Sequence, residues 1–328
     1  MRNRRRTPPS RWRRLALGVA TAAVLLGMVE VGLRIAGVVP AYQADLIGGW
    51  RMVPEIHGER LAGGDDTHPF IVTTNADGLR NGPARAKPPG LKRVALMGDS
   101  TMFGWGVDDG GTVADGVKAG LEGQPIEVIN AGQPGYSTTQ ITLFFESVVR
   151  YYEPDLTVVF LPMHDHNKVL VSDREYLDGP AGPVAAARVL LATHSLLYQV
   201  IRQHLYPLSE RPFLTPRDSD TEPRVYRVSE EERADNMARI ATLAAGWGGK
   251  LALGHLPFAP DFELGPTWRP GQEWAAAYCK EHGLALLDLR QRVPRAPGMT
   301  LPWDNGHLTA AGNIAAGQAA APLVAEAL

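Results

Sequence analysis

Short apolar runs alternate with stretches of helical periodicity through the C-terminal two thirds of the chain. Five runs are nearly uninterrupted, which is typical of strands buried on both faces of a parallel sheet: Arg93–Met97, Ile126–Asn130, Leu156–Leu161, Leu251–Leu256 and Leu284–Leu289. Five stretches with helical character lie between and after them: Val113–Leu121, Thr138–Tyr151, Ser229–Ala245, Trp274–His282 and Thr309–Leu328. This alternation predicts an α/β fold, a three-layer doubly wound sandwich around a parallel central sheet of the flavodoxin-like type.

A longer apolar stretch, Leu15–Val39, stands near the N-terminus. As a helix of about 25 residues it would extend for roughly 37 Å, enough to cross a bilayer. Glu30 and Arg34 interrupt it, but residues four apart face each other on a helix and can form an ion pair. The stretch therefore predicts one N-terminal transmembrane helix over residues 15–39, a signal anchor that precedes the α/β domain.

The residues before this stretch are strongly basic and include no acid. Seven arginines lie there: Arg2, Arg4, Arg5, Arg6, Arg11, Arg13 and Arg14. Arginine-rich flanks stay in the cytoplasm, so residues 1–14 are expected inside and the rest of the chain outside the cytoplasm. The uninterrupted part, Leu15–Val29, also suits the apolar region of a cleaved signal peptide, but no small-x-small cleavage site follows it directly. The alternative of a cleaved signal leaves the extracytoplasmic location unchanged.

The remaining chain divides into a lead-in and one large domain. Residues 40–90 are rich in Gly, Pro and polar side chains and predict a linker that becomes ordered near the turn-forming segment Thr73–Arg80. Residues 91–328 form the predicted α/β domain. Residues 168–227 break its regular alternation and are interpreted as an insertion or lid, with helical potential at Val184–Leu205.

Composition excludes several classes of function. The net charge of −2 and the lack of a basic patch give no support for nucleic-acid binding. The single cysteine, Cys279, cannot form an internal disulfide and is interpreted as a packed thiol. No Cys/His spacing typical of a metal site occurs, and the adjacent residues His164, Asp165 and His166 are poorly placed to converge on one ion. No metal and no cofactor are expected.

Polar residues follow the apolar runs at two places where a parallel sheet would bring them together. Ser100 follows the first strand within Gly98–Gly106, and Asp304 and His307 stand just before the last helix. Alone, Ser100 is compatible with a helix cap and the Asp-x-x-His spacing with a solvated turn. Together they predict a serine nucleophile with His307 as its base and Asp304 orienting that base, because serine needs such a base to react.

These segments resemble the SGNH/GDSL hydrolase family from about Asn75 to the C-terminus. The phrase Val128–Thr138 resembles the family's second block, in which a glycine N–H helps to bind the oxyanion; Gly135 is the match and Gly132 the fallback. Three further features resemble the membrane-anchored bacterial branch: Gly104–Val107, the Glu30/Arg34 pair and the lead-in segment Asn75–Arg80. The resemblance implies an acyl-enzyme on Ser100 and an oxyanion hole that includes the N–H groups of Ser100 and Gly135. Asp99 is interpreted as structural.

The third block of the family departs from its usual Gly-x-Asn-Asp. Aligning Asp165 with the aspartate puts Pro162 at the glycine and His164 at the asparagine. Histidine also carries an N–H, so His164 is expected to complete the oxyanion hole. Asn167 is a second candidate if the loop is shifted.

The expected function is cleavage of an O-acyl ester, with an envelope carbohydrate or lipid as the candidate substrate. An O-acetyltransferase with the same three residues is one alternative. A catalytically silent carbohydrate-binding or scaffold protein is another. The sequence does not identify protein partners.

Overall fold

The computed structural model of the chain describes residues 11–38, 42–45, 49–61, 68–169, 171–177, 187, 190–191, 194–201, 225–258, 261–262, 270–304 and 306–328. The α-helices are α1 (Arg11–Ile35), α2 (Ser100–Phe103), α3 (Val113–Gly120), α4 (Thr138–Ser147), α5 (Asp173–Leu177), α9 (Glu230–Ala245), α11 (Pro270–His282) and α12 (Ala310–Ala327). The strands are β1 (Tyr42–Asp45), β2 (Gly49–Met52), β3 (His57–Leu61), β4 (Phe70–Thr73), β5 (Lys92–Gly98), β6 (Ile126–Gly132), β7 (Leu156–Phe160), β8 (Lys168–Val169), β9 (Val225–Tyr226), β10 (Lys250–His255) and β11 (Ala285–Asp288). Two 3₁₀-helices are η1 (Val149–Tyr152) and η2 (Met163–His166).

The central sheet has five parallel strands in the order β11-β10-β7-β5-β6. The chain moves from β5 outward to β6 and then crosses back to β7, so the direction of winding reverses between β5 and β7. In open α/β sheets, ligands bind outside the carboxyl ends of the strands at this reversal. The predicted α/β fold with a parallel central sheet is confirmed. The residues that follow β5 and β7 lie at this reversal and are therefore candidates for a ligand site.

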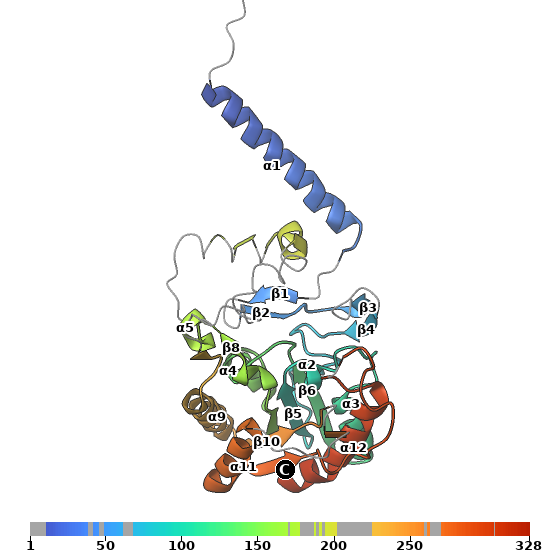
Figure 1. The fold of residues 1–328 in the computed structure, drawn as a ribbon. Coiled ribbons are helices and arrows are strands. Elements are labelled where there is room, and N and C mark those ends of the chain that lie inside the picture. Colours follow the sequence, from blue (N-terminus) through green and yellow to red (C-terminus); the bar gives the residue numbers. More distant parts are fainter. Residues whose placement is uncertain are drawn as a thin grey trace, which may run out of the picture.

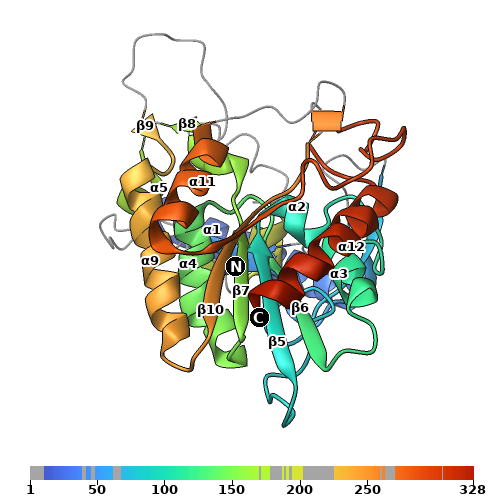
Figure 2. The same ribbon diagram turned by 90° about the horizontal axis from the view of Figure 1, so that it is seen from below.

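Helices cover both faces of the sheet, as Figure 2 shows, with α4, α9 and α11 on one face and α3 and α12 on the other. Each face has its own apolar core, in which strand side chains such as Met97 and Val159 pack on one side and Leu96 and Val158 on the other. All five residues of β7 are buried. This is why the strands contain apolar runs rather than an alternation of apolar and polar residues.

One predicted helix ends earlier than expected. The expected helix Thr138–Tyr151 is α4 only to Ser147, after which the backbone breaks at Val148 and continues as η1. The 3₁₀ turn brings the Tyr152 hydroxyl to Asp77 Oδ2, to which it donates at 2.6 Å. The tertiary contact with the lead-in therefore replaces the last helical turn that the sequence pattern predicts.

The lead-in contains two antiparallel hairpins, β1–β2 and β3–β4, that its Gly- and Pro-rich composition does not predict. Figure 1 shows them as a layer between α1 and the sandwich. Met52, Ile56 and Phe70 form a small core there with Phe103 of α2. The hairpins thus pack directly on the helix that begins at Ser100.

Helix α1 is, among the described residues, the one helix long and apolar enough to cross a membrane, and the apolar window within it is 0% buried. It projects away from the rest of the chain in Figure 1. Much of the insertion, including residues 178–186 and 202–224, lies outside the described residues, so the predicted helical potential at Val184–Leu205 is only partly covered. Helical residues are found between 190 and 201. The division of the chain into segments stays a prediction.

Candidate active site

Ser100 is the first residue of α2 and follows β5 directly, at the reversal of the sheet. Asp99 caps this helix, because its Oδ1 accepts from the N–H of Thr101 at 2.9 Å and from the Thr101 hydroxyl at 2.7 Å. Gly104, at φ 84°, ends the helix after a single turn. The structural role expected for Asp99 therefore agrees with its contacts, and Ser100 is held at a sharp strand-to-helix turn.

His307 lies between Ser100 and Asp304, although Ser100 is more than 200 residues away in sequence. The Ser100 Oγ and His307 Nε2 are 2.8 Å apart, and His307 Nδ1 is 2.5 Å from Asp304 Oδ2. Because a carboxylate can only accept, Nδ1 carries the proton and Nε2 is free to accept from the serine hydroxyl. The three residues predicted to act together are thus joined by one continuous chain of hydrogen bonds.

The loop before α12 fixes the positions of Asp304 and His307. Asp304 Oδ1 accepts from the N–H of Gly306 at 2.7 Å, and the backbone N–H of Leu301 donates to the carbonyl of His307 at 2.9 Å. The hydrogen bond from His307 lowers the pKa of Asp304 to about 2. Asp304 therefore remains ionised at neutral pH.

The loop after β6 presents Gly135 in the left-handed region, at φ 77°. Its carbonyl accepts from Arg227 Nη1 at 2.9 Å, and the neighbouring Pro134 carbonyl accepts from Trp50 Nε1 at 3.0 Å. Within the described residues, no acceptor is found for the Gly135 N–H. The loop is therefore fixed through its carbonyls, while one N–H remains available for a ligand.

Gly132, the fallback candidate, is committed to structural contacts. Its N–H donates to Asn130 Oδ1 at 3.1 Å. A Cβ at this position would lie 2.2 Å from the Phe103 N, so glycine is required for β6 to pass close to α2. These contacts favour Gly135 over Gly132 as an oxyanion donor.

His164 lies in η2, directly after β7, on the side of the site next to Asp99. Its Nε2 is 3.6 Å from Asp99 Oδ2, and its Nδ1 is 3.4 Å from the Nδ2 of Asn167. An amide nitrogen donates, so this contact favours the tautomer in which Nε2 carries the proton. Burial lowers the pKa of His164, whose side chain is 29% exposed. These contacts favour a neutral imidazole with its proton on Nε2, the nitrogen that faces Asp99, and Asn167 supports this form from the other nitrogen.

Asp165 joins the loop after β7 to the loop after β6. It is 1% exposed and accepts from the N–H and the hydroxyl of Thr138, both at 2.8 Å. Arg233 of α9 donates from Nε to Asp165 at 2.9 Å. The segments that carry His164 and Gly135 are therefore held together by one buried carboxylate.

Arg227 and Arg80 hold segments of the candidate site in place, and the spacing of sequence motifs predicts a role for neither. Arg227 also donates to Asp173 and Gln140, so it ties the end of the insertion to the loop of Gly135. No pattern at one position predicts a contact with a residue 92 positions away. Arg80 belongs to the lead-in and stands out in the sequence only through its resemblance to the membrane-anchored branch.

Arg80 holds the segment that follows α2. Its side chain is 0% exposed and donates to four backbone carbonyls and one carboxylate: those of Ile71, Phe103, Gly104, Val107 and Asp109. The guanidinium also lies over the ring of Phe103, 5.0 Å from its centroid. One buried cation thus fixes the lead-in, α2 and the glycine-rich loop relative to each other.

Arg80→Ala is expected to lower the free energy of unfolding by about 3–5 kcal/mol, because it leaves buried carbonyls unpaired. Urea unfolding of the folded domain measures this loss. Arg239→Ala is the matched control, since Arg239 is 60% exposed in a surface pair with Glu146 and should cost less than about 1 kcal/mol. Equal effects of the two substitutions would contradict the role of Arg80.

Two large apolar side chains that directly precede candidate site residues in the sequence are exposed. Trp303 precedes Asp304 and is 44% exposed, with its ring stacked on His68 at 3.8 Å between centroids. Met163 precedes His164 and is also 44% exposed. The part of the chain that the structure describes contains no group of three or more His, Cys, Asp or Glu side chains suited to a metal ion.

Searches of family models and of curated proteins match nothing. Among solved structures, the chain is similar to a lipase/acylhydrolase from Enterococcus faecalis, with 17% identity, a TM-score of 0.42 and coverage of 71% of this chain and 95% of that one. It is also similar to an acetylxylan esterase from Geobacillus stearothermophilus, solved as a catalytic mutant, with 13% identity, a TM-score of 0.43 and coverage of 74% and 96%.

A third similar structure, from Desulfitobacterium hafniense DCB-2, is described as lipolytic and of the G-D-S-L family, with 14% identity, a TM-score of 0.43 and coverage of 71% and 99%. The similarity extends over nearly the whole length of each of the three structures. The chain is thus structurally similar to GDSL-type lipolytic proteins and esterases, the family that its motifs resemble, and its chemistry has to be inferred from its own residues.

Proposed function

We propose that the chain is a serine hydrolase of the SGNH/GDSL type that cleaves an O-acyl ester through an acyl-enzyme on Ser100. The observation that carries this proposal is the continuous hydrogen-bonded line from Ser100 Oγ through His307 to Asp304. Such a line lets a neutral serine lose its proton as it attacks a carbonyl carbon. The two structural alternatives do not account for this contact. A serine that only caps a helix would not require a histidine beside its hydroxyl, and a solvated Asp-x-x-His turn would not require a serine beside its histidine.

The proton path follows from the tautomer. Ser100 Oγ attacks the acyl carbonyl while His307 Nε2 takes the hydroxyl proton. Asp304, ionised and hydrogen-bonded to Nδ1–H, stabilises the imidazolium. His307 then gives the proton to the leaving alcohol, and the acyl group stays on Ser100 until water, activated by the same imidazole, releases it as the acid.

Three N–H groups are the proposed oxyanion donors: the backbone N–H groups of Ser100 and Gly135 and the Nε2–H of His164. The Ser100 N–H is at the start of α2, where helical N–H groups have no partner within the helix. The Gly135 N–H has no acceptor within the described residues, and the carbonyl of the same residue is fixed by Arg227. Donors of this kind stabilise the developing charge because they are already oriented before the reaction.

Hydrolysis of p-nitrophenyl acetate by the purified full chain in detergent tests the reaction class. Release of p-nitrophenol with an equal amount of acetate is the expected result. Addition of a glycan acceptor distinguishes the O-acetyltransferase alternative, since a transferase would produce acetylated glycan in place of acetate. No release of p-nitrophenol, from this or longer acyl esters, would contradict both.

Trp303 supports the proposal that the ester is formed by a hydroxyl group of a carbohydrate. Trp303 directly precedes Asp304 in the sequence, and its exposed ring is stacked on the ring of His68. Aromatic surfaces with a few oriented polar groups are typical of small-molecule sites. An O-acylated envelope carbohydrate is therefore the proposed substrate, and an envelope lipid is the other candidate.

The location proposed for the site is outside the cytoplasm, at the membrane. The support is α1, whose apolar residues are exposed along its length, together with the arginines that precede and begin it. These charges are expected to remain on the cytoplasmic side. The helix is then an uncleaved single-pass anchor that holds the α/β domain near the outer surface of the bilayer.

His164→Asn is expected to retain ester hydrolysis, because asparagine supplies an N–H in place of that of the imidazole. Burial lowers the pKa of His164, so the imidazole is neutral at neutral pH and takes a proton only in acidic solution. The ratio of kcat/KM between the two proteins should therefore be constant from pH 6.5 to 9 and change only in more acidic solution. A ratio that changes within this range would assign proton transfer to His164.

A further inference from the structure

The outer end of α1 is fixed to the insertion through Glu30. Its Oε1 accepts from the N–H of Leu196 at 2.9 Å. Its Oε2 accepts from the N–H of Leu197 at 2.8 Å and from the Ser195 hydroxyl at 3.0 Å. This carboxylate on α1 therefore caps a helical turn of the insertion, more than 160 residues away in the chain.

Arg34 completes the contact from the next turn of α1. Its Nε donates to Glu30 Oε1 at 2.8 Å, and its Nη2 donates to the carbonyl of His194 at 2.9 Å. Only Glu30 and Leu33 of α1 are partly buried, whereas the other residues of this helix are exposed. Among the residues that the structure describes, the contact with the insertion is thus at the end of α1 that leads into the α/β domain.

The length of the apolar run puts Glu30 inside the membrane-spanning part of α1. As a helix, Leu15–Val29 is about 22 Å long, shorter than the hydrocarbon core of roughly 30 Å. Arg13 and Arg14 limit extension toward the N-terminus, so the span has to continue through Glu30 to about Arg34. An unpaired carboxylate at this depth is strongly unfavourable, and the insertion supplies the donors that satisfy it.

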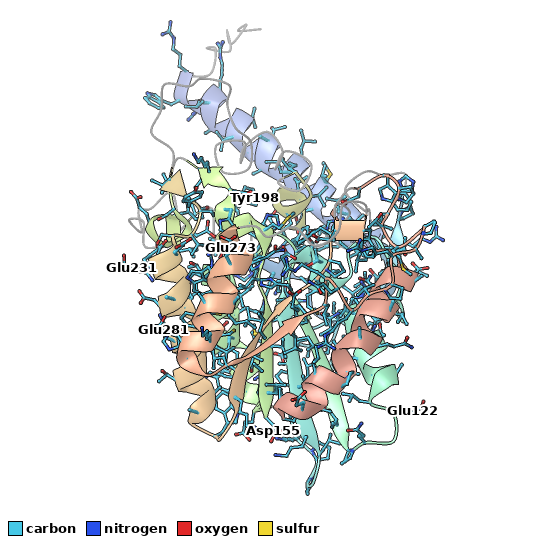
Figure 3. The ribbon with its side chains drawn as sticks, turned by 60° about the horizontal axis from the view of Figure 1, so that its bottom comes forward. Glu122, Asp155, Tyr198, Glu231, Glu273 and Glu281 are labelled. Carbon is cyan, nitrogen blue, oxygen red and sulfur yellow. The ribbon has the colours of Figure 1, made fainter. Side chains whose placement is uncertain are left out.

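Apolar side chains of the insertion are exposed beside this contact. Leu190, Leu191 and Ile201 are 61%, 46% and 44% exposed. Figure 3 shows Tyr198 on the side of the domain toward α1, away from Asp155, which lies at the opposite end of the domain, just before β7. The exposed apolar surface of α1 therefore continues onto the insertion.

We propose that residues 190–191 and 194–201 of the insertion lie in the outer interface of the bilayer that α1 crosses, with Leu190, Leu191 and Ile201 in contact with lipid. The occupant of this apolar surface is the bilayer itself, because the segment binds to α1 at Glu30, about one helical turn from the outer end of the membrane span. Interfacial helical segments bury their apolar side chains in this way. The inference rests on α1 being retained as an anchor and is independent of the reaction at Ser100.

Single cysteines labelled with an environment-sensitive fluorophore test this placement in the full chain, reconstituted into phosphatidylcholine/phosphatidylglycerol vesicles. The parent chain is the blank, because its one cysteine, Cys279, is buried. Leu191→Cys and Ile201→Cys report on the insertion and Val24→Cys on α1. Glu281→Cys, in α11 at the end of the domain opposite α1 in Figure 1, reports on the aqueous side.

Labels at 191 and 201 are expected to show blue-shifted emission and several-fold stronger quenching by lipids with a nitroxide near the headgroup than the label at 281. Iodide in solution should quench the label at 281 most. Glu30→Ala is expected to shift the labels at 191 and 201 toward iodide while the label at 24 remains in lipid.

If the labels at 191 and 201 behave like the label at 281, the segment lies outside the bilayer and the proposal is wrong. A label at 24 that lipid does not quench would also overturn it, because the anchor would then be absent. Protection of 191 and 201 from both iodide and lipid nitroxides would assign the apolar surface to a protein contact instead.

Discussion

Ser100→Ala is expected to lower kcat for ester hydrolysis by about 10⁴- to 10⁶-fold and leave the fold intact. The hydroxyl is the proposed nucleophile, and removing the nucleophile of such a triad leaves only the contribution of the oxyanion donors and of binding. Alanine is a good helix former, so α2 retains its start at Asp99. Steady-state kinetics with p-nitrophenyl acetate measure the loss, and near-UV circular dichroism checks the fold.

Ser147→Ala is the matched control for this substitution. Ser147 is the last residue of α4, and its hydroxyl donates to the Leu143 carbonyl of its own helix at 2.7 Å. This variant should hydrolyse ester at the rate of the unchanged chain. A small effect of Ser100→Ala, within a factor of ten, would mean that another group attacks the substrate.

Asp304→Asn is expected to reduce kcat by about 10⁴-fold with little change in the melting temperature. An amide can donate to His307 Nδ1, which favours the tautomer with its proton on Nε2. That nitrogen then no longer accepts from Ser100 Oγ, although the residues remain within hydrogen-bonding distance. The loss should appear in kcat rather than in KM, because Asp304 acts through His307.

Asp115→Asn is the control for this second prediction, because Asp115 caps α3 away from the site. It should lower stability slightly and leave kcat unchanged. If Asp304→Asn lowered kcat and stability together, or left kcat within tenfold, Asp304 would be a structural residue of the loop and not the group that orients the base.

The central sheet was predictable because its strands are buried on both faces. An uninterrupted run such as Leu156–Leu161 is possible only where no face meets water, and the structure buries all of β7. The lead-in hairpins were not predictable in the same way. Their strands have mixed polarity, as in His57–Leu61. The hairpins are held in place by contacts with α2 and with the loop after β6.

The candidate site residues whose side-chain chemistry is distinctive could be predicted from the sequence. Those that depend on how a loop folds, or on a contact with a distant segment, were less predictable. Ser100, Asp304 and His307 stand at strand and helix ends, and the structure brings them within hydrogen-bonding distance. The sequence leaves His164 and Asn167 as alternative candidates, because no local pattern predicts how the loop after β7 turns; in the structure it forms η2, which ends at Asn167. Arg227 was missed, since an arginine at the end of an irregular insertion carries no signal of its contact with Gly135.

The same limit applies to Glu30 and Arg34. The sequence predicts their pairing from the spacing of four residues, and the structure contains that pair. The contact of Glu30 with Leu196 and Leu197 is a tertiary event that no local pattern indicates. Positions of this kind are decided by how segments far apart in sequence pack together.

Mass spectrometry of the chain after reaction with a fluorophosphonate probe tests the central claim, that Ser100 is an activated nucleophile. The predicted result is one phosphonate adduct per chain, located on the peptide containing Ser100, absent from Ser100→Ala and strongly reduced in His307→Ala. A folded chain that binds glycan and shows no adduct on Ser100 would contradict the claim and support the silent carbohydrate-binding or scaffold protein.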